Sequence, residues 1–384
     1  MRILFTTLNA TSHLRLLAPI VLAARAAGHE TLLAGPPGLA AEAAEYGVDF
    51  APVGADWTHD PALTSTVAQQ LAFGAHEDYN RTLFDGVFFG RYALDFARDG
   101  IALARRWRPD LVVRVTEEVG GLLLAEALGL PHATVGSGNA HRMAADAIMS
   151  SVDRLRRELG LPTGVDPYPS LFASFVPRSY PGNPAVPTIR WYRQRDPERI
   201  GERMPDWFAD LPADRPVVYV AIGSWLSAMV WKTKPQIEAV VAALEAMDCT
   251  GIVAVGDAAA EVAAPGSTVR VVGQLPQPML LPSVDLFVSH GGAASVREAL
   301  RAGTPMVMTP IIGDQVEHAR FCTELGVART IATGRVSARA VRAAVSDVLG
   351  DPAYRQRARA VQREFLAAAP VEQLVDDLAA VAAG

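Results

Sequence analysis

The sequence predicts an α/β fold built from two successive doubly wound domains. Short apolar segments typical of buried strands alternate with helical segments in two separate runs, and the proline-rich residues 162–216 lie between the runs. The chain has 384 residues, of which 50% are hydrophobic. At about 150 residues per domain, this length favours two domains, each with a sizeable core.

The first run begins at the N-terminus. Residues 2–8 are expected to form a buried strand, 9–15 a polar loop, and 16–27 a helix that ends at Gly28. We expect further strands at 31–34, 49–53, 110–115 and 132–135, and helices at 38–46 and 121–128. Residues 56–96 carry scattered aromatic side chains and are expected to be less regular.

The second run follows the prolines. Strands are expected at 217–222, 251–255, 269–272, 286–289 and 306–309, and helices at 235–247, 293–302 and 316–325. Such alternation predicts parallel sheets with right-handed crossovers. Sheets of this kind bind ligands outside the carboxyl ends of their strands, at topological switch points.

Charge and composition exclude several classes of protein. The net charge is −6 and no long basic run is present, which argues against nucleic acid as a partner. The two cysteines, Cys249 and Cys322, form neither a disulfide framework nor a metal quartet, so a cytoplasmic location is expected. No segment approaches the roughly 18 apolar residues of a membrane span, and the first apolar run is too short for a signal peptide.

The segment LFVSHGGAASVREAL, residues 286–300, joins an expected strand to an expected helix through His290, Gly291 and Gly292. Backbone N–H groups at a helix N-terminus favour phosphate, and glycines let a ligand approach the backbone closely. Ser295 adds a hydroxyl group. The alternative is a tight turn between strand and helix that needs glycine for its geometry alone.

The neighbours of this segment complete a longer pattern. A Pro-Gln pair, then His-x-Gly-x-x-Ser-x-x-Glu, then Asp-Gln is matched by Pro276, Gln277, His290, Gly292, Ser295, Glu298, Asp314 and Gln315. This pattern resembles the donor-nucleotide signature of the family 1 glycosyltransferases, the UDP-glycosyltransferase superfamily, in its bacterial natural-product type. Residues 27–29 (AGH), 108–113 (RPDLVV) and 217–224 resemble the family as well.

The resemblance implies the GT-B fold, in which two Rossmann-like domains face each other across a cleft. Residues 1–205 would form the N-terminal acceptor-binding domain and residues 206–370 the nucleotide-sugar-binding domain. Residues 371–384 would form a C-terminal helix that crosses back to the N-terminal domain.

The resemblance also assigns roles at the donor site. The diphosphate would be held by His290 and by the backbone near Gly291, Gly292, Ala294 and Ser295, with Ser224 at the nucleotide–phosphate end. Leu275 and Gln277 would frame the base, Glu298 would bind the ribose, and Asp314 and Gln315 would hold the sugar hydroxyls. Structural alternatives are helix capping for His290 and Ser224, a favourable first-turn charge for Glu298, and a polar loop for the Asp-Gln pair. A carboxylate at Glu298 suits a ribose 2′-OH, so UDP is favoured over TDP.

The general base implied by the resemblance is His13, whose unperturbed pKa of about 6.5 suits the task. The family's orienting aspartate is missing, because Val115 occupies its position. Glu118 or Glu117 could replace it, or both could simply begin the next helix as favourable acids. His13 itself could instead be a surface-loop residue, with Ser12 beside it as a helix cap.

The expected reaction is metal-independent, inverting transfer of a sugar from a nucleotide-diphospho-sugar to a hydroxyl of a natural product. The acceptor would contact Ser12, Phe73, Phe84, Ser137 and Asn139, although the aromatic residues suit a core equally well. No cofactor, metal, nucleic acid or membrane partner is expected, and a homodimer is left open. Two rival functions are a UDP-sugar 2-epimerase and a non-catalytic helper protein that binds an enzyme.

Overall fold

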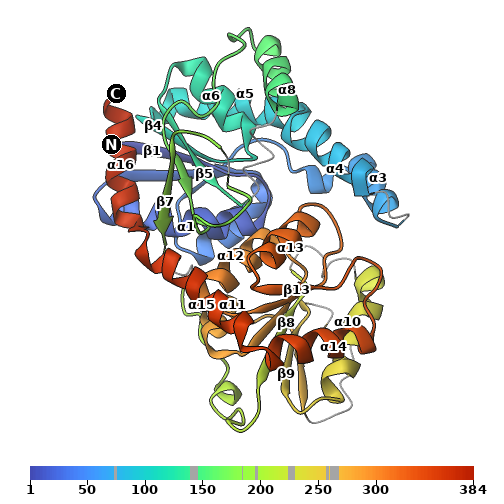
Figure 1. The fold of residues 1–384 in the computed structure, drawn as a ribbon. Coiled ribbons are helices and arrows are strands. Elements are labelled where there is room, and N and C mark those ends of the chain that lie inside the picture. The colour runs from blue at the N-terminus through green and yellow to red at the C-terminus, as the bar shows by residue number, and fades with distance from the viewer. Residues whose placement is uncertain are drawn as a thin grey trace. The chain divides into compact units, whose positions relative to one another are not determined.

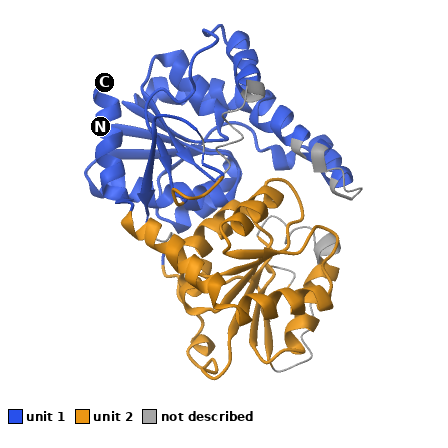
Figure 2. Ribbon diagram, in the orientation of Figure 1, with its two compact units in different colours: residues 1–176, 182–200, 368–384 blue, residues 177–181, 201–367 orange. Residues whose placement is uncertain are grey.

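The computed structural model describes residues 1–72, 76–138, 146–183, 185–194, 198–223, 230–256, 259 and 268–384. The chain divides into two compact units, shown in different colours in Figure 2. The first unit contains residues 1–176, 182–200 and 368–384, and the second contains residues 177–181 and 201–367. Each unit holds a parallel sheet with helices packed on it, so the predicted α/β class is confirmed (Figure 1).

The sheet of the first unit has eight strands. They are β1 (Arg2–Thr6), β2 (Glu30–Gly35), β3 (Phe50–Pro52), β4 (Leu111–Val115), β5 (His132–Gly136), β6 (Phe172–Ser174), β7 (Ile189–Arg193) and β14 (Ala369–Pro370). Their spatial order is β14-β7-β6-β5-β4-β1-β2-β3, and every pair is parallel. The order reverses between β1 and β4, which makes this the switch point of the sheet.

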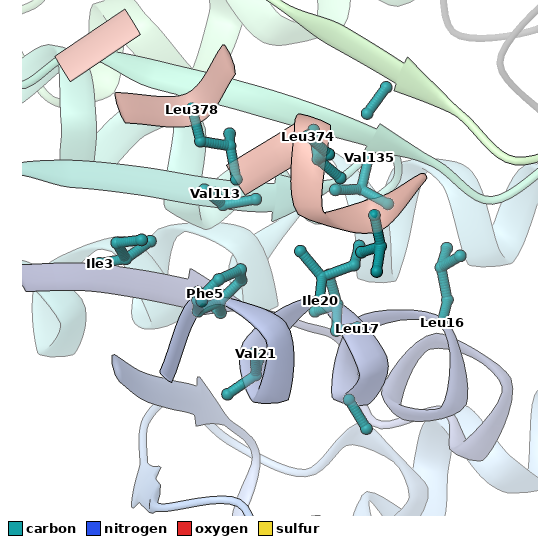
Figure 3. Packing of buried hydrophobic residues seen from close by; sticks show 14 of the residues in the cluster. Ile3, Phe5, Leu16, Leu17, Ile20, Val21, Val113, Val135, Leu374 and Leu378 are labelled. Carbon is teal, nitrogen blue, oxygen red and sulfur yellow. The ribbon is translucent and has the colours of Figure 1, made fainter. Parts of the chain in front are cut away.

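The helices of the first unit come from both ends of the chain. They are α1 (Thr11–Ala26), α2 (Ala40–Glu45), α3 (Pro61–Ala72), α4 (His76–Arg81), the π-helical η3 (Thr82–Phe88), α5 (Arg91–Trp107), α6 (Val119–Leu128), α8 (Asp146–Glu158) and α16 (Val371–Ala383). Of these, α1, α2, α6 and α16 contact strands of the sheet. Leu374 and Leu378 of α16 lie beside Val135 and Val113 of the sheet in one apolar cluster (Figure 3). Each such buried side chain contributes about 1.5–3 kcal/mol, so the C-terminal helix is an integral part of the first core.

Two expectations for the first unit were wrong in detail. Helix α1 begins at Thr11, inside the expected polar loop. Residues 56–96 hold helices rather than irregular chain, because Asp60 accepts hydrogen bonds from the amides of Ala62 and Leu63 and Pro61 takes the first helical position. The proline-rich stretch contains β6 and β7, which are too short to show a clear pattern.

The second unit has a six-stranded sheet. Its strands are β8 (Val217–Ala221), β9 (Thr250–Ala254), β10 (Val269–Val272), β11 (Leu286–Ser289), β12 (Met306–Met308) and β13 (Ala328–Thr330). The order is β10-β9-β8-β11-β12-β13, with every pair parallel. The switch point therefore lies between β8 and β11.

The helices of the second unit are α10 (Val230–Glu245), α11 (Gln277–Leu280), α12 (Ala293–Ala302), α13 (Gln315–Glu324), α14 (Ala338–Gly350) and α15 (Pro352–Ala367). The expected helices at 293–302 and 316–325 match α12 and α13 to within a residue. Helix α10 begins five residues before the expected position and contains Pro235 in its interior. Within the described ranges, no helix combines the length and apolar character that a bilayer crossing requires.

One buried histidine at the start of β5 makes the stability of the first unit sensitive to acid. Burial and the nearby Arg114 and Arg156 lower the pKa of His132 to about 4, and its Nδ1 has no hydrogen-bond partner among the described residues. The unfolded chain binds a proton there near pH 6.5, whereas the folded chain does so only near pH 4. The contribution of neutral His132 is therefore present above pH 6.5 and is lost as the pH falls toward 4.

We expect His132→Phe to flatten this dependence, removing about 2 kcal/mol of the loss in unfolding free energy between pH 6.5 and 4. Urea denaturation at several pH values, followed by circular dichroism, measures it. His59→Asn is the matched control, because the His59 side chain is 80% exposed. Parallel pH curves for wild type and His132→Phe would contradict the assignment.

Candidate functional site

At the switch point of the second sheet, the chain leaves β11 and enters α12 through three residues. Gly291 has a φ of +91°, and its N–H donates to Oγ of Ser289 at 3.1 Å. Gly292 occupies the N-cap position of α12 and has no side chain with which to cap the helix. The first-turn amides and the positive end of the helix dipole thus meet at a position suited to an anion.

His290 is 8% exposed and lies beside β8. Burial lowers its pKa to about 4, although a hydrogen bond to the carbonyl of Ala221 opposes the shift. Nδ1 lies 3.4 Å from that carbonyl oxygen, which can only accept. The imidazole is therefore neutral near pH 7 with its proton on Nδ1, and Nε2 is an acceptor in this state.

The two glycines that flank the imidazole are needed for its placement. A Cβ atom at Gly223 would lie 2.6 Å from the ring of His290, and one at Gly292 would lie 2.5 Å from its Nε2. Gly223 also has a φ of +84°. Glycine at these two positions leaves room for the imidazole of His290 and also permits the backbone conformation of the turn.

Three predicted donor residues form one buried cluster. The amide nitrogen of Gln277 donates to Oγ of Ser295 at 3.2 Å and to the Glu298 carboxylate at 2.7 Å. Glu298 is 3% exposed and lies in the second turn of α12, so the expected first-turn position was wrong. Its charge is held by a side-chain amide rather than by the helix dipole. Leu275 lies just before α11 and is half-buried, and Ala294 lies in the first turn of α12.

Asp314 and Gln315 follow β12 at the same edge of the sheet. Oε1 of Gln315 accepts hydrogen bonds from the amides of Ile311 and Ile312 at 2.9 and 3.1 Å, which fixes the orientation of the side-chain amide. Its nitrogen is left as the group that can donate to a ligand. Asp314 lies 3.2 Å from Nε2 of His318, a residue that the sequence reasoning missed.

The first unit brings His13, Glu117 and Ser137 together. They follow β1, β4 and β5, three adjacent strands at the switch point. His13 is in the first turn of α1, and its Nε2 lies 3.8 Å from Oε2 of Glu117, beyond hydrogen-bond range but within ion-pair range. The hydroxyl of Ser137 donates to Oε1 of Glu117 at 2.5 Å.

Glu118 points elsewhere. It is the N-cap of α6, where its carboxylate accepts from the amide of Gly121 at 2.9 Å and from the hydroxyl of Thr6 at 2.5 Å. Burial raises its pKa. Of the two expected candidates, the structure places Glu117 and not Glu118 next to His13, because the Glu118 side chain is used in the cap.

The remaining predicted residues fall into two groups. Ser12 lies inside α1, and the N-cap of that helix is Ala10, so a capping role for Ser12 was wrong. Phe84 stacks on Phe89 at 6.0 Å and packs against a buried cluster, as expected for a core residue. Ser224, Phe73 and Asn139 lie outside the described residues.

Among the described residues, no three His, Cys, Asp or Glu side chains are grouped as a metal site requires. Three further residues complete the clusters and were not predicted: Thr6, Tyr180 and His318. The i,i+4 spacing of Asp314 and His318 in DQVEH was a usable signal for one of them. Tyr180 lies in the proline-rich stretch, where no sequence pattern indicated a functional role.

Comparison with known proteins agrees with this arrangement. Residues 199–376 match the family model of UDP-glucoronosyl and UDP-glucosyl transferases. The chain is 26% identical to the 3-alpha-mycarosylerythronolide B desosaminyl transferase of Saccharopolyspora erythraea, over 100% of this chain and 99% of that protein. It is 25% identical to the aklavinone 7-beta-L-rhodosaminyltransferase of Streptomyces galilaeus, over 95% and 92%.

Solved structures share the fold over the whole chain. The spinosyn rhamnosyltransferase SpnG has a TM-score of 0.83 at 23% identity, covering 99% of this chain and 100% of that one. SnogD from Streptomyces nogalater has a TM-score of 0.78 at 24% identity, covering 100% and 99%. Together with the full-length relatives and the family model that residues 199–376 match, this shows that the chain is a glycosyltransferase with the GT-B fold, similar to the UDP-glycosyltransferases.

Proposed function

We propose that the protein transfers a deoxysugar from a TDP-sugar to a hydroxyl group of a natural-product aglycone, with inversion and without a metal ion. The observation that carries the proposal is that each unit has its own site at a switch point. The first unit has a histidine–carboxylate pair, and the second has an uncapped helix start beside a buried histidine. The relatives are named for rhodosaminyl, desosaminyl and mycaminosyl transfer, which supports the sugar class.

The choice of TDP replaces the sequence-based preference for UDP. That preference rested on Glu298 as a ribose ligand, but the Glu298 carboxylate already has a buried partner in Gln277. Neither the charge nor the burial of Glu298 then requires a 2′-OH. One relative is named a TDP-daunosamine transferase, and SpnG and VinC were solved with thymidine diphosphate.

The donor half has the parts that a leaving diphosphate needs. The first-turn amides of α12 and His290 stabilise the charge that develops as the bond between the anomeric carbon and the phosphate oxygen breaks. Gln315 donates from its amide nitrogen and Asp314 accepts from sugar hydroxyls, so the pair can fix the orientation of the sugar.

The acceptor half supplies the base. The imidazole of His13 takes the proton of the acceptor hydroxyl while the oxygen attacks the anomeric carbon in line, opposite the departing diphosphate. Glu117, held by Ser137, stabilises the imidazolium that results. The 3.8 Å contact is consistent with a site that tightens when substrates bind.

A transfer assay tests the proposal as a whole. The enzyme is incubated in EDTA with a panel of aglycones and either TDP-deoxysugars or UDP-hexoses. The products are identified by mass spectrometry. We expect a glycosylated aglycone and free TDP. Transfer from UDP-sugars alone would contradict the donor class, an altered sugar nucleotide without acceptor would indicate an epimerase, and donor binding without any turnover would indicate a helper.

Replacement of the proposed base separates chemistry from binding. We expect His13→Ala to lower kcat by about 10²-fold or more, since that is the usual size of a general-base effect. Glu117→Gln should lower kcat less, and Glu118→Gln should act mainly on the denaturation midpoint because its carboxylate caps a helix. Unchanged turnover in His13→Ala would remove it from the mechanism.

Donor binding should be accompanied by proton uptake. Neutral His290 keeps its proton on Nδ1, so donation from Nε2 to a diphosphate requires a second proton, and the anion raises the pKa from about 4. Affinity should therefore increase as the pH falls from 7 to 5.5. Calorimetry in buffers of different ionisation enthalpy measures the uptake.

The ligand in this experiment is an intact TDP-sugar, because the terminal phosphate of free TDP titrates near pH 6 itself. His290→Asn keeps a donor but cannot take up the proton, so its binding should show no buffer dependence. Binding by wild type without proton uptake would mean that the imidazole exchanges its tautomer and gives up the Ala221 carbonyl instead.

A further inference from the structure

A chain of three polar side chains runs from the interior of the second unit to the loop after β12. The hydroxyl of Tyr180 is hydrogen-bonded to Nδ1 of His318, and Nε2 of His318 lies 3.2 Å from Oδ2 of Asp314. Tyr180 is 2% exposed and the His318 side chain 1%, whereas the Asp314 side chain is 31% exposed. This series of hydrogen-bonded side chains therefore begins in the core at Tyr180 and ends at Asp314, which a ligand can reach.

The Asp314 carboxylate can only accept, so the contact at 3.2 Å assigns a proton to Nε2 of His318. Burial holds the pKa of Tyr180 well above its usual range, and the nearby Cys322, Asp314 and Glu317 add to the shift, so the phenol keeps its proton. In the neutral imidazole that carries its proton on Nε2, Nδ1 accepts from the Tyr180 hydroxyl. The proton on Nε2 points to the Asp314 carboxylate, which accepts it.

Asp314 occupies the N-cap position of α13 without acting as a cap. An aspartate there usually accepts from the first-turn amides and stabilises the helix by about 1 kcal/mol. In this described segment its carboxylate makes no capping hydrogen bond and is turned toward His318 instead. The backbone of Asp314 is helical, with φ −73° and ψ −13°, rather than extended as in a capping residue.

Aromatic packing holds the two inner members in place. The ring of Tyr180 meets Phe321 edge to face at 5.3 Å, and the ring of His318 meets the same phenylalanine at 6.4 Å. The backbone amide of Ser179 donates to the Glu364 carboxylate at 3.0 Å, which fixes the short segment 177–181 to α15. Both rings are therefore held by contacts that are independent of Asp314.

We propose that Tyr180 and His318 are positioning residues that hold the Asp314 carboxylate in the orientation that accepts hydrogen bonds from hydroxyl groups of the donor sugar. The inference rests on the proposed function, because Asp314 receives its sugar-binding role there. The proposed function alone does not say which part of the donor these residues affect. We infer that the Tyr180–His318–Asp314 hydrogen bonds affect binding of the sugar and leave binding of the nucleotide diphosphate unchanged. Preorganised groups of this kind lower the cost of ordering a side chain when the ligand binds.

The test compares two tyrosine-to-phenylalanine substitutions that each remove one hydroxyl hydrogen-bonded to another side chain, His318 for Tyr180 and Asp377 for Tyr192. Tyr180→Phe breaks the chain, and Tyr192→Phe removes the hydroxyl that binds Asp377 in the first unit. For Tyr180→Phe we expect a five- to twentyfold rise in KM for the TDP-sugar, a smaller change in kcat, and a Kd for TDP within twofold of wild type. Tyr192→Phe should leave both constants unchanged.

A second pair of variants tests whether the hydrogen bonds themselves matter. His318→Phe should reproduce or exceed the KM effect, whereas His318→Gln should recover part of it because its amide can accept from Tyr180 and donate to Asp314. Equal KM values for wild type and Tyr180→Phe would overturn the proposal. Equal weakening of TDP and TDP-sugar would also overturn it, because that result assigns Tyr180 a purely structural role.

The outcomes separate this inference from the function on which it rests. If wild-type enzyme transfers no sugar from a TDP-sugar, the proposed function fails whatever Tyr180→Phe does. If wild type is active and Tyr180→Phe has the kinetics of wild type, the proposed function stands and the positioning chain fails.

Discussion

Parallel strand pairing is the constraint on which both candidate sites depend. In a parallel sheet every strand ends at the same edge, so loops that are distant in sequence meet there. The order of strands reverses between β1 and β4 in the first sheet and between β8 and β11 in the second. His13 and Glu117 follow the first pair, and Gly223 and His290 follow the second. The order of the strands thus determines where the two candidate sites lie.

At these edges, buried polar groups are held by specific partners. His290 is neutral and donates to a carbonyl, Glu298 accepts from Gln277, and the Glu118 carboxylate caps a helix. Because an unpaired buried polar group costs about 1–3 kcal/mol, such pairing fixes each side chain in one orientation. The same hydrogen bonds direct each carboxylate: Glu298 faces Gln277 and Glu118 caps α6, whereas Glu117, bonded to Ser137, lies beside His13.

The sequence was sufficient for the fold class, the glycosyltransferase activity and several element boundaries, because strand β11 and helix α12 have strong local patterns joined by His290, Gly291 and Gly292. It was insufficient where tertiary contacts decide. Glu117 and Glu118 are adjacent and chemically identical, and only the neighbouring Thr6 and Ser137 side chains distinguish them. Tyr180 meets His318 across 138 residues, a distance that no local pattern encodes. The preference for UDP rested on the Glu298 carboxylate alone, and its hydrogen bond from Gln277 is not evident from the sequence.

Nucleotide specificity tests the central claim most directly. Calorimetric titration of the purified protein with TDP, UDP, GDP and ADP, each with and without EDTA, reports on the donor site independently of the unidentified acceptor. We expect TDP to bind more tightly than the other three nucleotides, with an affinity that EDTA leaves unchanged. A protein that binds none of the four nucleotides, or that binds TDP only when a divalent cation is present, would contradict the assignment of His290 and the α12 N-terminus as the diphosphate site.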